Sequence, residues 1–262
     1  MPPAHVALVL HAHLPYVRHP EHPRSLEERW LFEALWESYL PLLDILDRLA
    51  GAGVRAPLTL SISPPLAAML RDPLLGRRFE RHLDRVEALA GRAAAHLAGG
   101  AFAPALAFHR RRLEEARATW AACRGDLLGA FRRQAAAGHI ELITTAATHA
   151  FLPGLLPTPA SIRAQIRLGR RGFGALLHGD PGAGPQGFWL PECGFDPRLD
   201  QELGSGGVRF TVLDAHAFEL ASPRPEEGAA VPIVTPGGVV CFARDPGSAR
   251  EVWSRDRGYP GH

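Results

Sequence analysis

Short apolar runs alternate with longer amphipathic stretches along this chain. The short runs have the length and composition of strands, and we expect strands at residues 5–10, 57–63, 139–145, 186–192, 209–214 and 239–244. The longer stretches carry apolar positions at helical spacing, and we expect helices over residues 27–50, 76–98, 105–137 and 159–177. Strands that alternate with helices predict an α/β fold built on a parallel sheet.

Side chains capable of chemistry stand at or just past the ends of four of these predicted strands. His11 and His13 follow the first strand and His149 follows the third, whereas Glu192 closes the fourth and Asp214 the fifth. In parallel α/β barrels and open sheets, ligands and catalytic groups gather at the carboxyl ends of the strands. The pattern therefore predicts a functional site at that edge.

Residues 187–195 (GFWLPECGF) form the most informative stretch, because an aromatic and aliphatic run ends there in a carboxylate. Aromatic side chains such as Trp189 and Phe195 stack on the C–H face of a sugar ring, and a carboxylate beside them can attack the anomeric carbon. A nucleophile of this kind needs a second carboxyl group roughly 5 Å away. The sequence does not identify that group: Asp214 ends a strand, but a helix N-cap role suits it equally well. The competing interpretation of Glu192 is a solvated residue at the end of a strand.

The pair His11 and His13 permits two chemical interpretations. Alternate residues past a strand end can both face a cavity and bind a metal ion, with His149 or Asp214 as a third ligand. The same histidines can instead donate hydrogen bonds to sugar hydroxyls or to Glu192. The chain has neither a strand-end Asp pair nor an HxxxH helix, so the pattern favours hydrogen bonding, or plain loop histidines, over a metal site.

Composition narrows the class of protein. A chain of 262 residues that is 46% hydrophobic can bury a sizeable core. The net charge is +2 with no long basic run, so charge gives no reason to expect a nucleic acid or a membrane as partner. All 29 basic residues are Arg. Three widely spaced cysteines and the lack of a signal-like N-terminus predict a reducing, cytoplasmic setting.

Several segments resemble conserved regions of glycoside hydrolase family 57. Residues 11–16 (HAHLPY) resemble the family's N-terminal motif, residues 138–153 its second region, and residues 189–195 (WLPECGF) the third, which holds the family's glutamate nucleophile. Further segments are similar to the branching enzymes of this family: residues 28–34, 242–246, 252–254 and 258–261. The matches run in family order from residue 5 to the end of the sequence.

The resemblance implies the N-terminal portion of an incomplete (β/α)7-type barrel, with residues 1–262 in one catalytic portion and no separate second domain. It implies a retaining transferase that cuts α-1,4 links of an amylose- or glycogen-like glucan and forms α-1,6 branches. Glu192 would be the nucleophile. The implied substrate-binding residues are His11, His13, His149, Trp189 and, as a further candidate, Asp214. A carboxylate pair needs no metal and no organic cofactor.

Two departures from the family pattern bear on activity. Branching members are about twice as long, and their acid/base aspartate lies beyond the region matched here, so we expect this polypeptide alone to be nearly inactive and to need the missing half as its partner. Residues 223–236 also lack the tyrosine of a mobile loop that helps to exclude water. Alternatives are an α-amylase or 4-α-glucanotransferase of the same family, a non-catalytic glucan-binding remnant, and a metal-dependent hydrolase built on the histidines.

Overall fold

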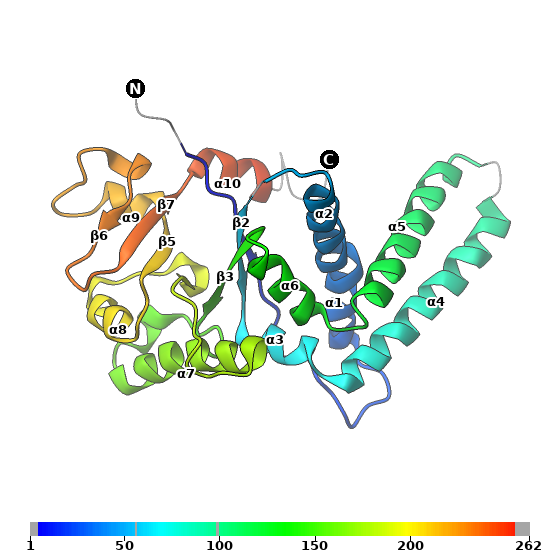
Figure 1. Ribbon diagram of the computed structural model, residues 1–262, viewed down its shortest axis with the longest axis horizontal. Coiled ribbons are helices and arrows are strands. Elements are labelled where there is room, and N and C mark those ends of the chain that lie inside the picture. The colour runs from blue at the N-terminus through cyan, green and yellow to red at the C-terminus, as the bar shows by residue number, and fades with distance from the viewer. Residues whose placement is uncertain (1–4, 56, 98–99, 255–262) are drawn as a thin grey trace. The chain divides into compact units, whose positions relative to one another are not determined.

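The computed structural model describes residues 5–55, 57–97 and 100–254 (Figure 1). The chain divides into two compact units. The first comprises Met1–Leu60 and Pro65–Glu141, and the second comprises Ser61–Pro64 and Leu142–His262. The predicted single barrel portion without a second domain stays a prediction. The segment 258–261, which carries part of the family resemblance, lies outside the described residues.

The first unit is mainly helical. The predicted helix 27–50 is confirmed as a continuous helical run, although its middle turn is a π-helix. In chain order the helices are α1 (Leu26–Ala34), the π-helix η1 (Leu35–Tyr39), α2 (Leu40–Gly51), α3 (Pro64–Leu70), α4 (Pro73–Leu97), α5 (Ala103–Ala122) and α6 (Leu127–Ala136). Ser25 caps α1, since its side chain accepts a hydrogen bond from the Glu27 backbone N–H at 3.3 Å.

The predicted single helix over 105–137 is wrong, because the chain turns between α5 and α6. Arg124 and Gly125 have left-handed φ angles of 54° and 72°, which end α5. Asp126 then caps α6 by accepting a hydrogen bond from the Gly129 N–H at 2.9 Å. Helices α4 and α5 lie side by side as a hairpin (Figure 1), where Phe79 meets Trp120 edge to face with ring centroids 4.9 Å apart.

In the residues that the structure describes, seven strands form two sheets. The strands are β1 (Val9–Ala12), β2 (Leu58–Ile62), β3 (Ile140–Thr145), β4 (Phe188–Trp189), β5 (Phe210–Asp214), β6 (Ile233–Val234) and β7 (Val240–Arg244). One sheet has the order β1-β2-β3-β4, and the other has the order β5-β7-β6. β3 pairs in parallel with β4, and β5 in parallel with β7, as the alternation of strands and helices predicts. β6, which we did not predict, is antiparallel to β7.

Two predicted strands have other bounds in the structure. The first strand lies at Val9–Ala12 instead of residues 5–10, so His11 is inside it. The fourth spans only Phe188–Trp189 instead of residues 186–192. β4 is short because its partner β3 ends at Thr145, which pairs with Trp189, and no further backbone groups are available for pairing beyond that point.

The second unit places its helices close to the ends of its strands. Its helices are α7 (Pro159–His178), α8 (Asp200–Ser205), α9 (Ala215–Glu219), α10 (Pro246–Trp253) and the 3-10 turns η2 (Leu152–Leu155), η3 (Pro191–Cys193), η4 (Pro197–Leu199) and η5 (Gly228–Ala230). A Cβ on Gly169 would lie 2.3 Å from the Thr145 carbonyl oxygen, so only glycine lets α7 pack this closely on the end of β3. Buried apolar residues from α7, α8, α9, β4, β5 and the residues around β7 form one core.

None of the helices that the structure describes is both long and apolar enough to cross a membrane. The three cysteines, Cys123, Cys193 and Cys241, are buried and free.

Candidate active site

Glu192 lies in the 3-10 turn η3, directly after β4, and not at the end of a strand as predicted. Its φ of 56° and ψ of 24° are left-handed, and the following Cys193 also has a positive φ of 51°. Such conformations cost of order 1 kcal/mol or more for residues with a Cβ, and they concentrate at functional sites. The turn presents the Glu192 carboxylate outward, because its side chain is 80% exposed.

Gly194 follows this turn and lets the backbone pass close to an aromatic ring. A Cβ at Gly194 would lie 2.3 Å from the Phe151 ring, so the backbone after Glu192 runs against an aromatic face. Phe151 is half-exposed and precedes η2. The backbone of this turn therefore runs beside Phe151, an aromatic residue that the sequence does not single out. Phe195, which the sequence does single out, packs partly buried against the core of the second unit.

His149 approaches Glu192 from the segment that follows β3. Its Nε2 lies 4.0 Å from Glu192 Oε1, and its own φ of 56° is left-handed. The described residues include four non-glycine positions with positive φ, and three of them are His149, Glu192 and Cys193. Backbone strain thus concentrates where the predicted site residues meet.

Thr145 ties His149 to β4. Its hydroxyl donates to the Trp189 carbonyl at 2.7 Å, and its oxygen lies 3.3 Å from His149 Nδ1. Since the one hydroxyl proton is used toward Trp189, the oxygen accepts from the His149 Nδ1–H. Burial lowers the pKa of His149, which keeps the ring neutral near neutral pH. The Nε2 lone pair then faces Glu192 and can accept a hydrogen bond from a hydroxyl that enters between them.

Asp214 pairs with Arg244 at the end of the second sheet. The two residues are register partners at the last positions of β5 and β7, and their side chains form an ion pair. Asp214 occupies the N-cap position of α9, but its side chain makes no cap hydrogen bond, so the alternative role weighed for it does not apply. Its carboxylate is held by Arg244.

Cys193 directly follows Glu192 in η3 and is buried. Burial raises the pKa of its thiol to about 11, Arg244 opposes the rise, and Asp214 and Glu192 add to it. The thiol is therefore protonated near neutral pH and is a poor nucleophile. Strand β5, which ends at Asp214, contacts the turn η3 that holds Glu192, so the two carboxylates lie in one neighbourhood.

The remaining two predicted residues belong to the first unit. His11 lies in β1 and His13 just after it, and their rings are stacked with centroids 6.1 Å apart and an interplanar angle of 18°. The structure thus gathers His149, Trp189, Glu192 and Asp214 in the second unit, and His11 with His13 in the first. Among the residues that the structure describes, no three His, Cys, Asp or Glu side chains form a group that could hold a metal ion.

Two residues of this neighbourhood were missed from the sequence. Thr145 bridges His149 and Trp189, and Arg244 holds Asp214. The sequence does contain a signal for Arg244, because it ends a predicted strand as Asp214 does.

Comparisons with known proteins identify the family of this chain. Residues 7–247 match the model of glycosyl hydrolase family 57. The chain belongs to this family. It is 32% identical to the 1,4-alpha-glucan branching enzyme TK1436 of Thermococcus kodakarensis over 98% of this chain and 41% of that protein. It is 29% identical to the probable 1,4-alpha-glucan branching enzyme Rv3031 of Mycobacterium tuberculosis over 99% of this chain and 50% of that protein. The chain thus spans about half the length of the curated relatives it matches, or less.

Solved structures match the fold of this chain. The alpha-amylase AmyC of Thermotoga maritima superposes with a TM-score of 0.89 at 38% identity, and the match covers 98% of this chain and 48% of that one. The family 57 branching enzyme of Pyrococcus horikoshii superposes with a TM-score of 0.85 at 31% identity, over 97% of this chain and 49% of that one. The predicted fold class, a portion of an incomplete family 57 barrel, is confirmed by these matches.

Proposed function

We propose that this chain supplies the nucleophile and part of the glucan-binding site of a family 57 branching enzyme. Such an enzyme cuts an α-1,4 link of a glucan and rejoins the cut chain as an α-1,6 branch. The main support for this proposal is that branching enzymes match 98–99% of this chain. Within the matched region, a left-handed turn exposes the Glu192 carboxylate beside His149. The relatives' activity is the reason for choosing transfer as the reaction.

In the proposed reaction, a Glu192 carboxylate oxygen attacks the anomeric carbon of the sugar at the cut. The bond to the leaving 4-oxygen breaks, and that oxygen takes a proton from an acid/base carboxyl group. A hydroxyl of an acceptor glucan then displaces Glu192, and the same acid/base group removes the hydroxyl proton. The neutral His149 accepts a hydrogen bond from a sugar hydroxyl at Nε2, and Trp189 and Phe151 offer aromatic faces to the rings.

The acid/base group is assigned here to the part of the relatives that this chain does not match. Asp214 is a poor candidate for a proton donor, because its carboxylate is already occupied by the ion pair with the Arg244 guanidinium. Without that acid/base group, the 262-residue polypeptide alone would not protonate the leaving oxygen of its substrate. That loss typically lowers the rate by about 10²- to 10⁴-fold.

An activated donor tests this proposal on the polypeptide as it is. Fluoride leaves without being protonated, so a maltotriosyl α-fluoride needs the nucleophile but not the acid. We expect the 262-residue chain to release fluoride from this donor and to act far more slowly on amylose. Glu192→Gln removes the nucleophile and is expected to abolish fluoride release.

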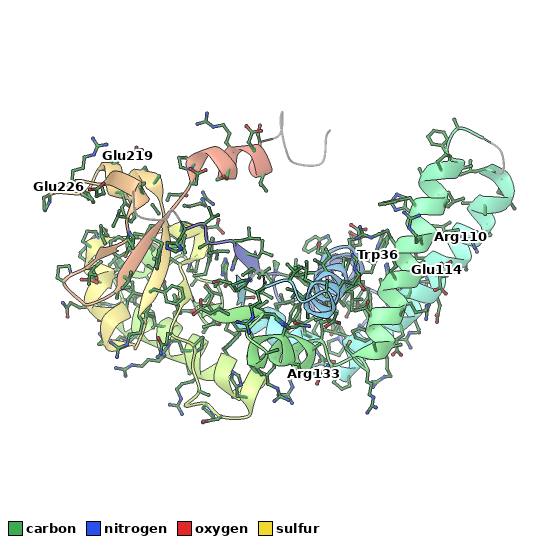
Figure 2. All side chains as sticks on the ribbon, turned by 45° about the horizontal axis from the view of Figure 1, so that its top comes forward. Trp36, Arg110, Glu114, Arg133, Glu219 and Glu226 are labelled. Carbon is green, nitrogen blue, oxygen red and sulfur yellow. The ribbon has the colours of Figure 1, made fainter. Side chains whose placement is uncertain are left out.

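Glu219→Gln is the matched control, because Glu219 is an exposed carboxylate on α9 (Figure 2) and makes the same change of charge. The assignment of Glu192 as nucleophile would be refuted if Glu192→Gln still released fluoride. It would also be refuted if Glu219→Gln abolished fluoride release as completely as Glu192→Gln. If the 262-residue chain branched amylose at an ordinary enzymatic rate, the proposal that its acid/base group lies outside this chain would be wrong.

Hydrolysis is the second candidate, and the close superposition on the alpha-amylase AmyC favours it. The two reactions differ in product. Transfer to a 6-hydroxyl creates α-1,6 links, which a debranching enzyme cuts into shorter chains, whereas hydrolysis leaves only linear fragments.

A further inference from the structure

A pocket rich in arginine lies in the first unit, away from the residues discussed so far. It has a volume of about 360 Å³ and is bordered by the start of α1 and the middle of α4. Its lining includes five arginines: Arg24, Arg29, Arg78, Arg81 and Arg85. We call it the arginine pocket.

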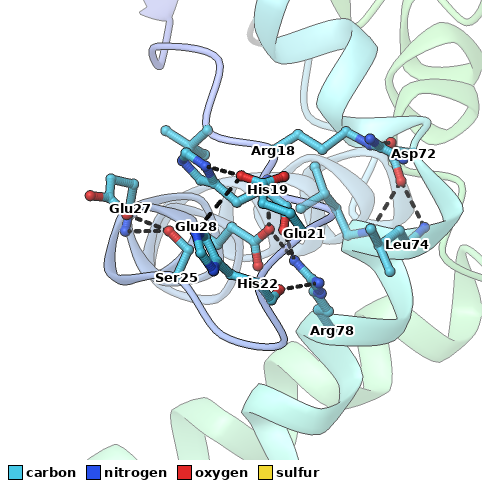
Figure 3. A network of polar contacts seen from close by, with 12 residues as sticks. Arg18, His19, Glu21, His22, Ser25, Glu27, Glu28, Asp72, Leu74 and Arg78 are labelled. Atoms are coloured by element: carbon cyan, nitrogen blue, oxygen red, sulfur yellow. Dashed lines mark hydrogen bonds and ion pairs between the residues drawn. The ribbon is translucent and has the colours of Figure 1, made fainter.

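One of these arginines uses both of its terminal nitrogens within the protein, although its buried Nε has no partner among the described residues. Arg78 is buried and forms an ion pair with the buried Glu28, and it donates to the carbonyls of His19 at 3.0 Å and His22 at 2.5 Å (Figure 3). Two buried charges that neutralise each other form a rigid base for the pocket. Arg78 is therefore structural and leaves the other arginines to face the pocket.

Three of the remaining arginines have no ion-pair partner among the described residues: Arg24, Arg81 and Arg85. Arg81 and Arg85 follow Arg78 by three and seven positions on α4, so they share its face of the helix. Partial burial and the charges of Arg24, Arg81 and Arg29 lower the pKa of Arg85. The arginines thus repel one another across the pocket.

The acidic side chains nearby leave Arg24, Arg81 and Arg85 uncompensated, because they pair with Arg117 of α5 or with Arg29. Asp84 and Glu87 on α4 both form ion pairs with Arg117 of α5, at 2.8 Å and 2.5 Å. Glu33 pairs with Arg29 along α1 at 3.3 Å. The pocket therefore keeps an excess of positive charge.

His82 gives an independent indication of a ligand. It lines the same pocket and is 7% exposed, and its Nε2 has no hydrogen-bond partner among the described residues. Its ring packs on Phe32 with centroids 5.4 Å apart. Buried polar nitrogens nearly always have a hydrogen-bond partner, so this nitrogen points to a group that enters the pocket.

We propose that the arginine pocket binds a phosphate group, either as free phosphate or as the phosphomonoester of a small molecule. Guanidinium groups match phosphate oxygens through paired hydrogen bonds, and a dianion offsets most of the excess charge of Arg24, Arg81 and Arg85. The pocket also has an apolar wall of Phe32, Val86 and Leu89, and its volume suits a small organic ligand. This site is independent of the Glu192 chemistry.

Titration calorimetry on the 262-residue protein at low ionic strength tests the proposal, with inorganic phosphate in one series and glucose 1-phosphate in the other. We expect saturable binding of one phosphate group per chain. Tighter binding of glucose 1-phosphate would assign the pocket to a phosphomonoester, and equal binding would assign it to the phosphate group alone.

The variant Arg81→Gln with Arg85→Gln is expected to raise Kd by about tenfold or more, because charge-assisted hydrogen bonds to the phosphate are lost. Arg77→Gln with Arg92→Gln is the matched control. Both residues are exposed on α4 and outside the pocket, and the control removes the same charge. It is expected to change Kd less than twofold. All four positions are exposed, so both variants retain the fold. No saturable binding of either probe, or equal weakening by both variants, would overturn the proposal.

Discussion

Removing the Thr145 hydroxyl tests whether the contact between β3 and β4 sets the state of His149. Thr145 is fully buried, and its hydroxyl serves two partners, the Trp189 carbonyl at 2.7 Å and His149 Nδ1 at 3.3 Å. Thr145→Val keeps the shape of the side chain and removes both hydrogen bonds. The backbone and the neighbouring core are otherwise unchanged.

The expected cost follows from the two groups left without a partner. A buried polar group that loses its hydrogen bond costs about 1–3 kcal/mol. The contact to Trp189 is short and the contact to His149 is long, so we expect a total of about 2–4 kcal/mol in the free energy of unfolding. For a chain of this size that lowers Tm by roughly 5–15 °C.

The more specific readout is the tautomer of His149. With Thr145 present, the proton sits on Nδ1. Without the hydroxyl acceptor, we expect it to move toward Nε2, where it can face the Glu192 carboxylate. The ¹⁵N chemical shifts of the two ring nitrogens distinguish these forms.

Thr144→Val is the matched control. Thr144 is equally buried on the same strand and donates one hydrogen bond, to the Ile62 carbonyl at 3.2 Å. The control should destabilise the protein without changing the His149 tautomer. If Thr145→Val leaves the tautomer unchanged, or if Thr144→Val shifts it equally, the proposed role of Thr145 is wrong.

Further predictions concern pH, a buried ion pair and the cysteine beside Glu192. Burial lowers the pKa of His149 from its ordinary value of 6.5, so the unfolded chain takes up its proton first as pH falls, and stability should decrease below pH 6.5. In His149→Gln, the urea midpoint of unfolding should depend less on pH below 6.5 than it does in the unaltered protein. An equal pH dependence in both would show that burial of His149 does not cause the loss of stability. Arg78→Met leaves Glu28 as an uncompensated buried charge and should cost about 3–5 kcal/mol in urea unfolding, whereas a loss below 1 kcal/mol would show that the ion pair is not buried in solution. Cys193→Ala should leave fluoride release within about twofold, because a thiol with a pKa of about 11 takes no part as a nucleophile, and a tenfold loss would contradict this.

Hydrophobic patterning predicted most regular elements to within a few residues. The helix expected at 159–177 is α7 (Pro159–His178), and the strand expected at 209–214 is β5 (Phe210–Asp214). Both have clear apolar positions bounded by proline, glycine or charged residues. The break after α5 was missed because the alanine- and arginine-rich pattern continues across Arg124, although Gly125 and the capping Asp126 are sequence signals of a helix end and a helix start.

The candidate site was predicted as a set of residue types at strand ends, but not as a geometry. The distance from His149 to Glu192 depends on two left-handed residues that no local pattern indicates. The Thr145 bridge depends on the parallel register that sets Thr145 opposite Trp189, and this register is a property of the folded sheet. Long-range pairing of this kind is set by packing between segments far apart in sequence.

Identifying the residue that becomes glycosylated tests directly whether Glu192 is the nucleophile. A maltooligosaccharyl fluoride carrying a second fluorine at C5 of the reacting sugar would slow turnover and let the covalent intermediate accumulate. Proteolysis and mass spectrometry would then locate the added sugar. We expect an ester on Glu192 that is lost in Glu192→Gln and kept in Glu219→Gln. An ester on another carboxylate, or no adduct while fluoride is still released, would contradict it.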